Sequence, residues 1–150
     1  MARVLYLVVC AAPPARAISE PIGLLQAKNW TVCVIATPSA TEWIDSHSLA
    51  EQTGYLVRHD YQPDGSDSLP HADAIAVAPA TFNTVNKWVA GTSDTFALGL
   101  LNEAIGLRLP ILAESRPDQE TVTRVSVIRI SAARCTMKAV AITAATRLTR

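Results

Sequence analysis

The chain has 150 residues, which is enough for one domain and too few for two full cores. Apolar residues make up 49% of it, so burial can offset the entropy lost on folding, which argues against wholesale disorder. Thirteen Lys and Arg balance thirteen Asp and Glu, and this argues against a general nucleic-acid binder because such proteins are basic.

Neither a membrane segment nor a disulfide framework is expected. The apolar run at residues 4–12 is too short to span a bilayer, and it lacks the positive leader and cleavage site of a signal peptide. Three cysteines without a C-x-x-C pair are typical of a reducing cytoplasm. Cys10 and Cys33 fall in apolar strands as small hydrophobic residues, and Cys135 has no His or acid beside it to complete a nucleophile.

Short apolar strands and helices alternate through the first half of the chain. Residues 3–10 form a near-continuous apolar run, typical of a strand buried on both faces. Pro14 follows at a position suited to a first helical turn. We then expect a helix at 17–29, a buried strand at 30–36 and a second helix at 40–50.

The alternation continues in the second half. A short third strand is expected at 54–57, and a polar loop with Gly and two Pro follows at 60–70. The later elements are a strand at 73–78, helices at 82–90 and 94–105, and a fifth strand at 109–113.

This alternation predicts an α/β fold with a doubly wound, mostly parallel sheet, a Rossmann- or flavodoxin-like three-layer sandwich. Ligands in such folds bind outside the carboxyl ends of the strands. Those ends lie here at residues 11–14, 37–41, 79–84 and 114–115.

The last 35 residues differ from the rest. Residues 1–115 carry six basic and eleven acidic side chains, a net charge of −5, whereas residues 116–150 carry seven and two, a net charge of +5. All glycines and all aromatic residues lie before position 107. We therefore expect one ligand-binding domain at 1–115 and an atypical, partly disordered tail at 116–150, with an edge strand within 122–130 and a helix-permissive stretch at 132–148.

The most informative stretch follows the strand at 73–78. Pro79 lacks a donor and ends the strand, and the small residues Ala80 and Thr81 allow a planar ligand to approach the backbone. Asn83 offers a donor and an acceptor, which suit an imide edge or a carboxylate. An equally ordinary interpretation is that Asn83 only caps a helix.

Three motifs in the right order resemble one family. Pro79-Ala80-Thr81-Phe82-Asn83-Thr84 resembles the PASANT motif of the homo-oligomeric flavin-containing cysteine decarboxylases. The segment 91–98 (GTSDTFAL) resembles that family's Gly-x-x-Asp-Asn-Leu-Leu segment, and the segment 34–44 resembles its second strand and following turn. The likeness covers residues 3–114 and is greatest to small actinobacterial flavoproteins of the family.

The resemblance implies FMN bound noncovalently between subunits of a trimer or dodecamer, an arrangement in which small chains share the walls of one pocket. The implied flavin-binding residues are Ala12, Pro13 and Pro14 in the first turn, Thr37, Ser39 and Thr41 near the phosphate, Trp43 as an aromatic neighbour, and Ala80, Thr81, Asn83 and Asp94. Trp43 packing in the core is an equal alternative. Trp88 and Val89 are interface candidates, with burial in the core as their alternative.

The reaction implied by the resemblance is oxidative decarboxylation of a C-terminal cysteine of a precursor peptide to an enethiol, with Asn83 as the catalytic residue that holds the carboxylate. The partners would be a peptide or small cysteine-containing substrate, further copies of the chain and a modification enzyme, with no nucleic acid, no membrane and no metal. Two alternatives remain: an FMN-binding protein without decarboxylase activity that acts with a partner enzyme, and a phosphopantothenoylcysteine decarboxylase-like enzyme.

Two departures from the family bear on this hypothesis. Pro13 and Pro14 remove backbone donors from a first turn that is normally Gly-Ser/Thr-x-Ala. The resemblance also implies a histidine eight residues before Asp73, where Gly65 stands. His59 and His71 lie six residues to either side, and a solvent-exposed loop histidine is the ordinary interpretation of His71.

Overall fold

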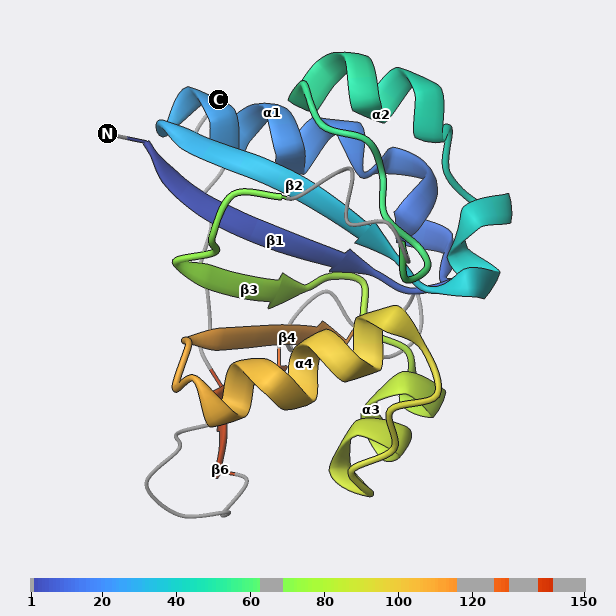
Figure 1. Ribbon diagram of the computed structural model, residues 1–150, viewed down its shortest axis with the longest axis vertical. Helices are drawn as coiled ribbons and strands as arrows, with labels where there is room; N and C mark the ends of the chain where they lie inside the picture. The colour runs from blue at the N-terminus through green and yellow to red at the C-terminus, as the bar shows by residue number, and fades with distance from the viewer. Residues whose placement is uncertain (1, 63–68, 116–125, 130–137, 142–150) are drawn as a thin grey trace, which may run out of the picture.

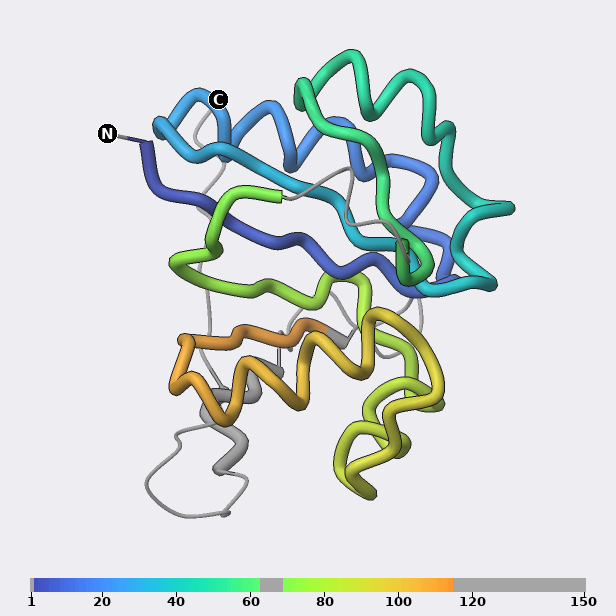
Figure 2. The backbone as a smooth tube through the Cα atoms, viewed as in Figure 1, coloured from blue at the N-terminus to red at the C-terminus, as the bar shows by residue number. Residues whose placement is uncertain are grey.

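The structure is a computed structural model, and it describes residues 2–62, 69–115, 126–129 and 138–141 (Figures 1 and 2). Its strands are β1 (Arg3–Val9), β2 (Trp30–Ala36), β3 (Ala74–Val77), β4 (Ile111–Ser115), β5 (Ser126–Arg129) and β6 (Lys138–Ala141). Its helices are η1 (Pro13–Ala17), α1 (Ser19–Ala27), η2 (Pro38–Glu42), α2 (Ser46–Thr53), α3 (Phe82–Val89) and α4 (Phe96–Gly106), of which η1 and η2 are short 3₁₀ helices.

The strands form one sheet in the order β2-β1-β3-β4-β5-β6. The first four are parallel, and β5 and β6 add antiparallel to β4. The order β2-β1-β3-β4 is that of flavodoxin-like folds, in which the chain switches sides between β1 and β3. The predicted α/β class and mostly parallel sheet are confirmed.

Alternate side chains of β1 enter two different cores, which explains its unbroken apolar sequence. Leu7 and Val9 pack with η1, α1 and α2 on one face. Val8, and Cys10 directly after the strand, pack with α3 and α4 on the other. Figure 1 shows these helix pairs on either side of the sheet, giving the predicted three layers.

Side-chain caps fix where α2, α3 and α4 begin. The carboxylate of Asp45 accepts a hydrogen bond from the Ser48 amide at the start of α2. Thr81 and Thr95 cap α3 and α4 in the same way. Gly54 ends α2 with a φ of 78°, a left-handed conformation that favours glycine.

The predicted third strand at 54–57 is wrong. The Thr53 hydroxyl bonds to both the amide and the carbonyl of Tyr55, a local turn that competes with strand pairing. Only Arg58 forms a bridge with β2, opposite Ile35.

The predicted helix at 40–50 is also corrected, because η2 ends at Glu42 and α2 restarts at the Asp45 cap. The helix expected at 17–29 is shorter and is preceded by η1, which starts at the two prolines. β4 begins two residues later than expected.

Two strands fall within residues 116–150, and the division of the chain at residue 115 stays a prediction. β5 falls inside the stretch 122–130 expected to hold an edge strand, although β6 pairs with its outer side. β6 overturns a helix at 138–141, where strand pairing overrides a helix-permissive sequence. The expected disorder, the rest of the tail and Cys135 lie outside the described residues.

Candidate functional site

Backbone hydrogen bonds bring three turns together at the carboxyl edge of the parallel strands. The Cys10 amide donates to the Pro79 carbonyl over 3.1 Å, which joins the turns after β1 and β3. The Thr37 amide donates to the Val9 carbonyl over 3.0 Å, which adds the turn after β2. The predicted binding residues of these turns therefore share one edge of the sheet, at the β1–β3 switch point where open α/β sheets bind ligands.

The turn after β1 is compact and poor in donors. Ala12 precedes η1, and its carbonyl accepts the Ala15 amide over 2.8 Å. Pro13 is exposed and Pro14 half-buried, and neither has an N–H to offer an anion.

The turn after β2 supplies hydroxyl groups of unequal availability. Thr37 is buried, whereas Ser39 is exposed. The Thr41 hydroxyl donates to the Pro38 carbonyl over 2.7 Å within η2. Ser39 is therefore the hydroxyl of this turn that faces solvent most openly.

Trp43 is half-buried and packs against the apolar core between α1, α2 and the sheet. The Arg16 guanidinium lies 4.8 Å from the centroid of its ring. Trp43 therefore packs against the core, as the alternative to a flavin contact expects. One face of its ring already contacts a cation, the Arg16 guanidinium of η1.

The turn after β3 leads into α3 and leaves the amide side chain of Asn83 exposed to solvent. Ala80 is buried, and its amide donates to the Glu114 carbonyl over 2.7 Å. Thr81 caps the helix, so Asn83 does not; it is an exposed residue of the first turn. The capping alternative for Asn83 is therefore wrong, and its amide is open to a ligand.

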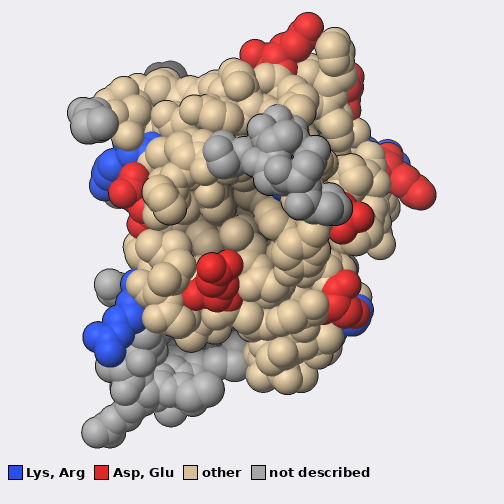
Figure 3. Space-filling view, viewed as in Figure 1, with Lys and Arg blue, Asp and Glu red and all other residues tan. Residues whose placement is uncertain are grey.

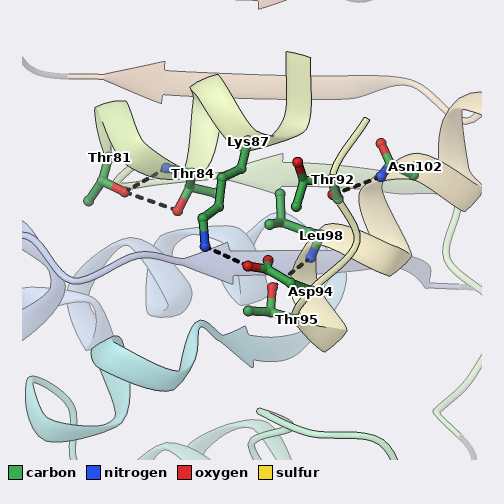
Figure 4. A network of polar contacts seen from close by, with 8 residues as sticks. All are labelled: Thr81, Thr84, Lys87, Thr92, Asp94, Thr95, Leu98 and Asn102. Carbon is green, nitrogen blue, oxygen red and sulfur yellow. Dashed lines mark hydrogen bonds and ion pairs between the residues drawn. The ribbon is translucent and has the colours of Figure 1, made fainter. Parts of the chain in front are cut away.

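Asp94 lies near this turn and has a protein partner. Its carboxylate pairs with the Lys87 ammonium over 2.6 Å, which links α3 to the segment before α4 (Figure 4). The Asn102 amide donates to the Thr92 carbonyl and braces the same segment. Asp94 thus helps fix α3 against α4, a partnership that the sequence analysis missed.

The two candidate histidines, His59 and His71, lie at opposite edges of the sheet. His59 follows the bridge between Arg58 and Ile35, near the carboxyl end of β2. His71 precedes β3 near its amino end, where the Asp73 amide donates to the Val4 carbonyl. Both are exposed, as expected for His71, and only His59 belongs to the edge that carries the three turns.

An apolar hollow with a volume of about 750 Å³ runs between α1 and the strands β3 and β4. Alanines at 74, 76 and 78 form part of its lining, and Leu24 and Leu112 contribute as well. Pro14 is the one predicted binding residue that lines it. The hollow is therefore not a ready-made pocket for the predicted ligand.

Burial suppresses the ionisation of two core groups. Burial raises the pKa of the Cys33 thiol to about 11, so this cysteine is protonated at neutral pH. Burial, followed by the nearby Cys33, also raises the pKa of Tyr6, whose hydroxyl donates to the Pro70 carbonyl over 2.7 Å. Both groups therefore stay protonated at neutral pH.

The described residues contain no group of three His, Cys, Asp or Glu side chains placed to hold a metal ion. On the face seen in Figure 3, charged side chains of both signs are scattered and form no wide basic patch. No helix in the described part of the chain is long and apolar enough to cross a membrane.

The donor set at the carboxyl edge fits a flavin mononucleotide. Ala12 and Ala80 present little bulk to a planar ring, and the exposed Asn83 amide can pair with an imide. Ser39 provides an exposed hydroxyl for a phosphate at the start of η2.

Comparison with known proteins gives structural likeness only. No family model and no curated protein matches the chain. Among solved structures, it resembles the cypemycin decarboxylase CypD (22% identity, TM-score 0.65, 78% of this chain and 71% of that one). It also resembles the FMN-dependent cysteine decarboxylase SpaF (18%, TM-score 0.62, 77% and 68%). A third similar structure is an EpiD variant in complex with the substrate peptide DSYTC (21%, TM-score 0.60, 78% and 67%). At these identities the likeness establishes the fold.

Proposed function

We propose that this protein binds FMN at the carboxyl edge of its sheet and oxidatively decarboxylates the C-terminal cysteine of a precursor peptide to an enethiol. Three lines support the proposal: the motif resemblance in the sequence, the flavodoxin-like strand order, and the similarity to structures of proteins described as cysteine decarboxylases. The substrate peptide bound to the EpiD variant supports a peptide substrate.

The observation that carries the proposal is the contact between the turns after β1 and β3. The Cys10–Pro79 hydrogen bond joins the turns that contain Ala12 and the Ala80–Asn83 segment, which follow the adjoining strands β1 and β3 at the switch point. In flavodoxin-like folds FMN occupies this position. The position of the PASANT-like motif at this edge therefore supports its proposed role in binding FMN.

The predicted binding residues other than Trp43 each have a definite part in this hypothesis. Ala12, Pro13, Pro14, Ala80 and Thr81 would border the ring, and Thr37, Ser39 and Thr41 the phosphate. FMN would supply a two-electron acceptor for the oxidation of the cysteine. Asn83 would hold the substrate carboxylate through its exposed amide, and the Lys87–Asp94 pair would fix α3 on which Asn83 stands.

We propose that the active form is a homo-oligomer. Phe82 is 80% exposed and Val89 is 59% exposed at the two ends of α3, an unusual placement for large apolar side chains beside a binding site. A second copy that covered them would supply the missing wall for FMN. Trp88 is buried in the core and does not serve such an interface.

The first experiment is to purify the protein, record its visible spectrum and identify the bound flavin. It is then mixed with a peptide that ends in cysteine, and mass spectrometry is used to look for loss of CO₂ and two hydrogen atoms. A matched peptide that ends in serine is the control. A colourless protein that does not bind added FMN even in its oligomeric form would overturn the proposal. A yellow protein that leaves the peptide intact would overturn the proposed decarboxylase activity.

The role of Asn83 is tested against Asn86, which is exposed on the same helix. Asn83→Ala should abolish conversion or flavin retention, and Asn86→Ala should leave both unchanged. Equal behaviour of the two variants would remove Asn83 from the site. Conversion of phosphopantothenoylcysteine but not of the peptide would favour the alternative of a phosphopantothenoylcysteine decarboxylase-like enzyme.

A further inference from the structure

The segment 58–61 follows the stretch 54–57, where the sequence predicts a third strand, and runs beside the end of β2. The Arg58 amide donates to the Val34 carbonyl over 3.0 Å, and the Arg58 carbonyl accepts the Ala36 amide over 2.8 Å. This parallel register places His59 level with Ala36, one residue before Thr37. The segment therefore reaches the same edge as the candidate site.

Tyr61 attaches the other end of this segment to α4. Its ring packs edge-on against Phe96, with centroids 5.1 Å apart and planes at 88°. Its hydroxyl lies directly against Gly99, where an added Cβ would collide with the hydroxyl and lie 3.4 Å from Cζ. We call this place on α4 the Gly99 notch.

His59 is thus held between two anchors. Arg58 is fixed to β2 on one side, and Tyr61 is seated on the first turn of α4 on the other. Figure 1 shows this part of the chain where β1 and β2 end and α4 begins, whereas β3 starts at the far edge. The contacts of Arg58 and Tyr61 therefore fix the position of the His59 backbone at the carboxyl edge. His71 lies at the opposite edge of the sheet.

Resting on the function proposed above, we propose that the segment 58–61, seated by Tyr61 in the Gly99 notch, is a wall of the substrate site and presents His59 to the peptide. An imidazole can donate a hydrogen bond to a carboxylate or carbonyl and accept one from a thiol or amide. The cysteine end of a peptide offers all of these groups. Gly99 and Tyr61 are positioning residues in this arrangement.

The notch is tested by Gly99→Ala, with Gly106→Ala as its control on the same helix. An added Cβ at Gly106 meets nothing within 4 Å. Because the atom displaced by Gly99→Ala is the tip of an exposed side chain, the fold should survive while Tyr61 leaves its seat. We expect unchanged flavin content and a KM for the peptide raised roughly tenfold, the loss of about one hydrogen bond.

A double variant makes the test specific. Tyr61→Phe removes the hydroxyl that an alanine would strike, and the Cζ distance is ordinary contact. Gly99→Ala combined with Tyr61→Phe should therefore recover most of the KM. Failure of this rescue would overturn the notch as the cause.

A structural readout is independent of activity. Hydrogen exchange of the Ala36 and Arg58 amides reports the attachment of the segment to β2. Both amides should exchange faster in Gly99→Ala than in Gly106→Ala. Equal exchange in the two variants would show that Tyr61 does not hold the segment.

The histidine is tested by His59→Asn against His71→Asn. With flavin content unchanged in both, His59→Asn should raise the peptide KM and His71→Asn should not. If the wild-type protein is active and His59→Asn and His71→Asn have equal KM values for the peptide, the segment 58–61 is not a wall of the substrate site. The proposed function would stand in that case. A wild-type protein that never converts the peptide would instead overturn the proposed function and the role of His59 together.

Discussion

Replacing Thr81 with alanine should destabilise the protein more than loss of an ordinary helix cap. The Thr81 hydroxyl oxygen accepts a hydrogen bond from the Thr84 amide over 3.3 Å and donates one to the Thr84 hydroxyl over 3.0 Å (Figure 4). Thr84 is buried, with 7% of its surface exposed. The substitution therefore removes a cap and also leaves a buried hydroxyl without this partner.

The two losses can be given magnitudes. Removal of a threonine cap costs about 1 kcal/mol, and a buried hydroxyl deprived of its partner costs about 1 kcal/mol more. The free energy of unfolding should fall by about 2 kcal/mol in Thr81→Ala. Thr95 caps α4 through one bond to the Leu98 amide, over 3.2 Å, so Thr95→Ala should cost about half as much.

Urea unfolding followed by circular dichroism measures these differences in the flavin-free protein. Thr81→Ser keeps the hydroxyl and should lie close to the wild type. The expected order of stability is wild type, Thr81→Ser, Thr95→Ala and Thr81→Ala. If Thr81→Ala proves as stable as Thr95→Ala, the bond to the Thr84 hydroxyl contributes nothing and the reasoning is refuted.

Three further predictions concern the core and the charged pair. Ile22→Ala should lower the free energy of unfolding by about 2–5 kcal/mol because Ile22 is fully buried. Leu24 lies on the same helix but is 64% exposed, so Leu24→Ala should lower it by under about 1 kcal/mol. Equal urea midpoints for the two variants would contradict this prediction. The pKa of Cys33 is raised from 9.0 to about 11 in the folded protein, which favours the protonated thiol. The free energy of unfolding should therefore keep its full value below pH 9 and fall as the pH rises towards 11. Unfolding at pH 8 and 10.5 under reducing conditions should show a smaller decline in Cys33→Ala, and an equal decline would contradict the assignment. Lys87→Met breaks a partly exposed ion pair with Asp94 and should cost under about 1 kcal/mol at low salt and less at high salt; a salt-independent loss would point to packing instead.

The strands that the sequence predicted well are those whose burial is dictated by local composition. Residues 30–36 are predicted to the residue because an unbroken apolar run suits a strand buried on both faces, and β1 follows the same rule. The segment 54–57 has similar residues, yet the Thr53 hydroxyl and the left-handed Gly54 fix a turn there. Local side-chain bonding of this kind leaves no trace in hydrophobic periodicity.

The location of the candidate site could be predicted from the sequence because the ends of the strands could be predicted. Each of the three turns follows a recognisable strand, so their meeting at one edge follows from parallel topology. The pairing of Lys87 with Asp94 and of Tyr61 with Gly99 depends on how α3, α4 and the connection pack, which no local pattern specifies. The roles of the predicted binding residues themselves stay predictions.

The three indoles of this chain sit in three distinct surroundings, and this makes them natural optical reporters. Trp88 is enclosed by the apolar core with no hydrogen-bond partner for Nε1, so it should emit at short wavelength. Trp30 lies 4.2 Å under the Arg3 guanidinium at the amino edge, and Trp43 lies under that of Arg16 beside the second turn. Single-tryptophan versions would therefore let fluorescence follow the helix layer, the far edge and the ligand edge separately during a titration.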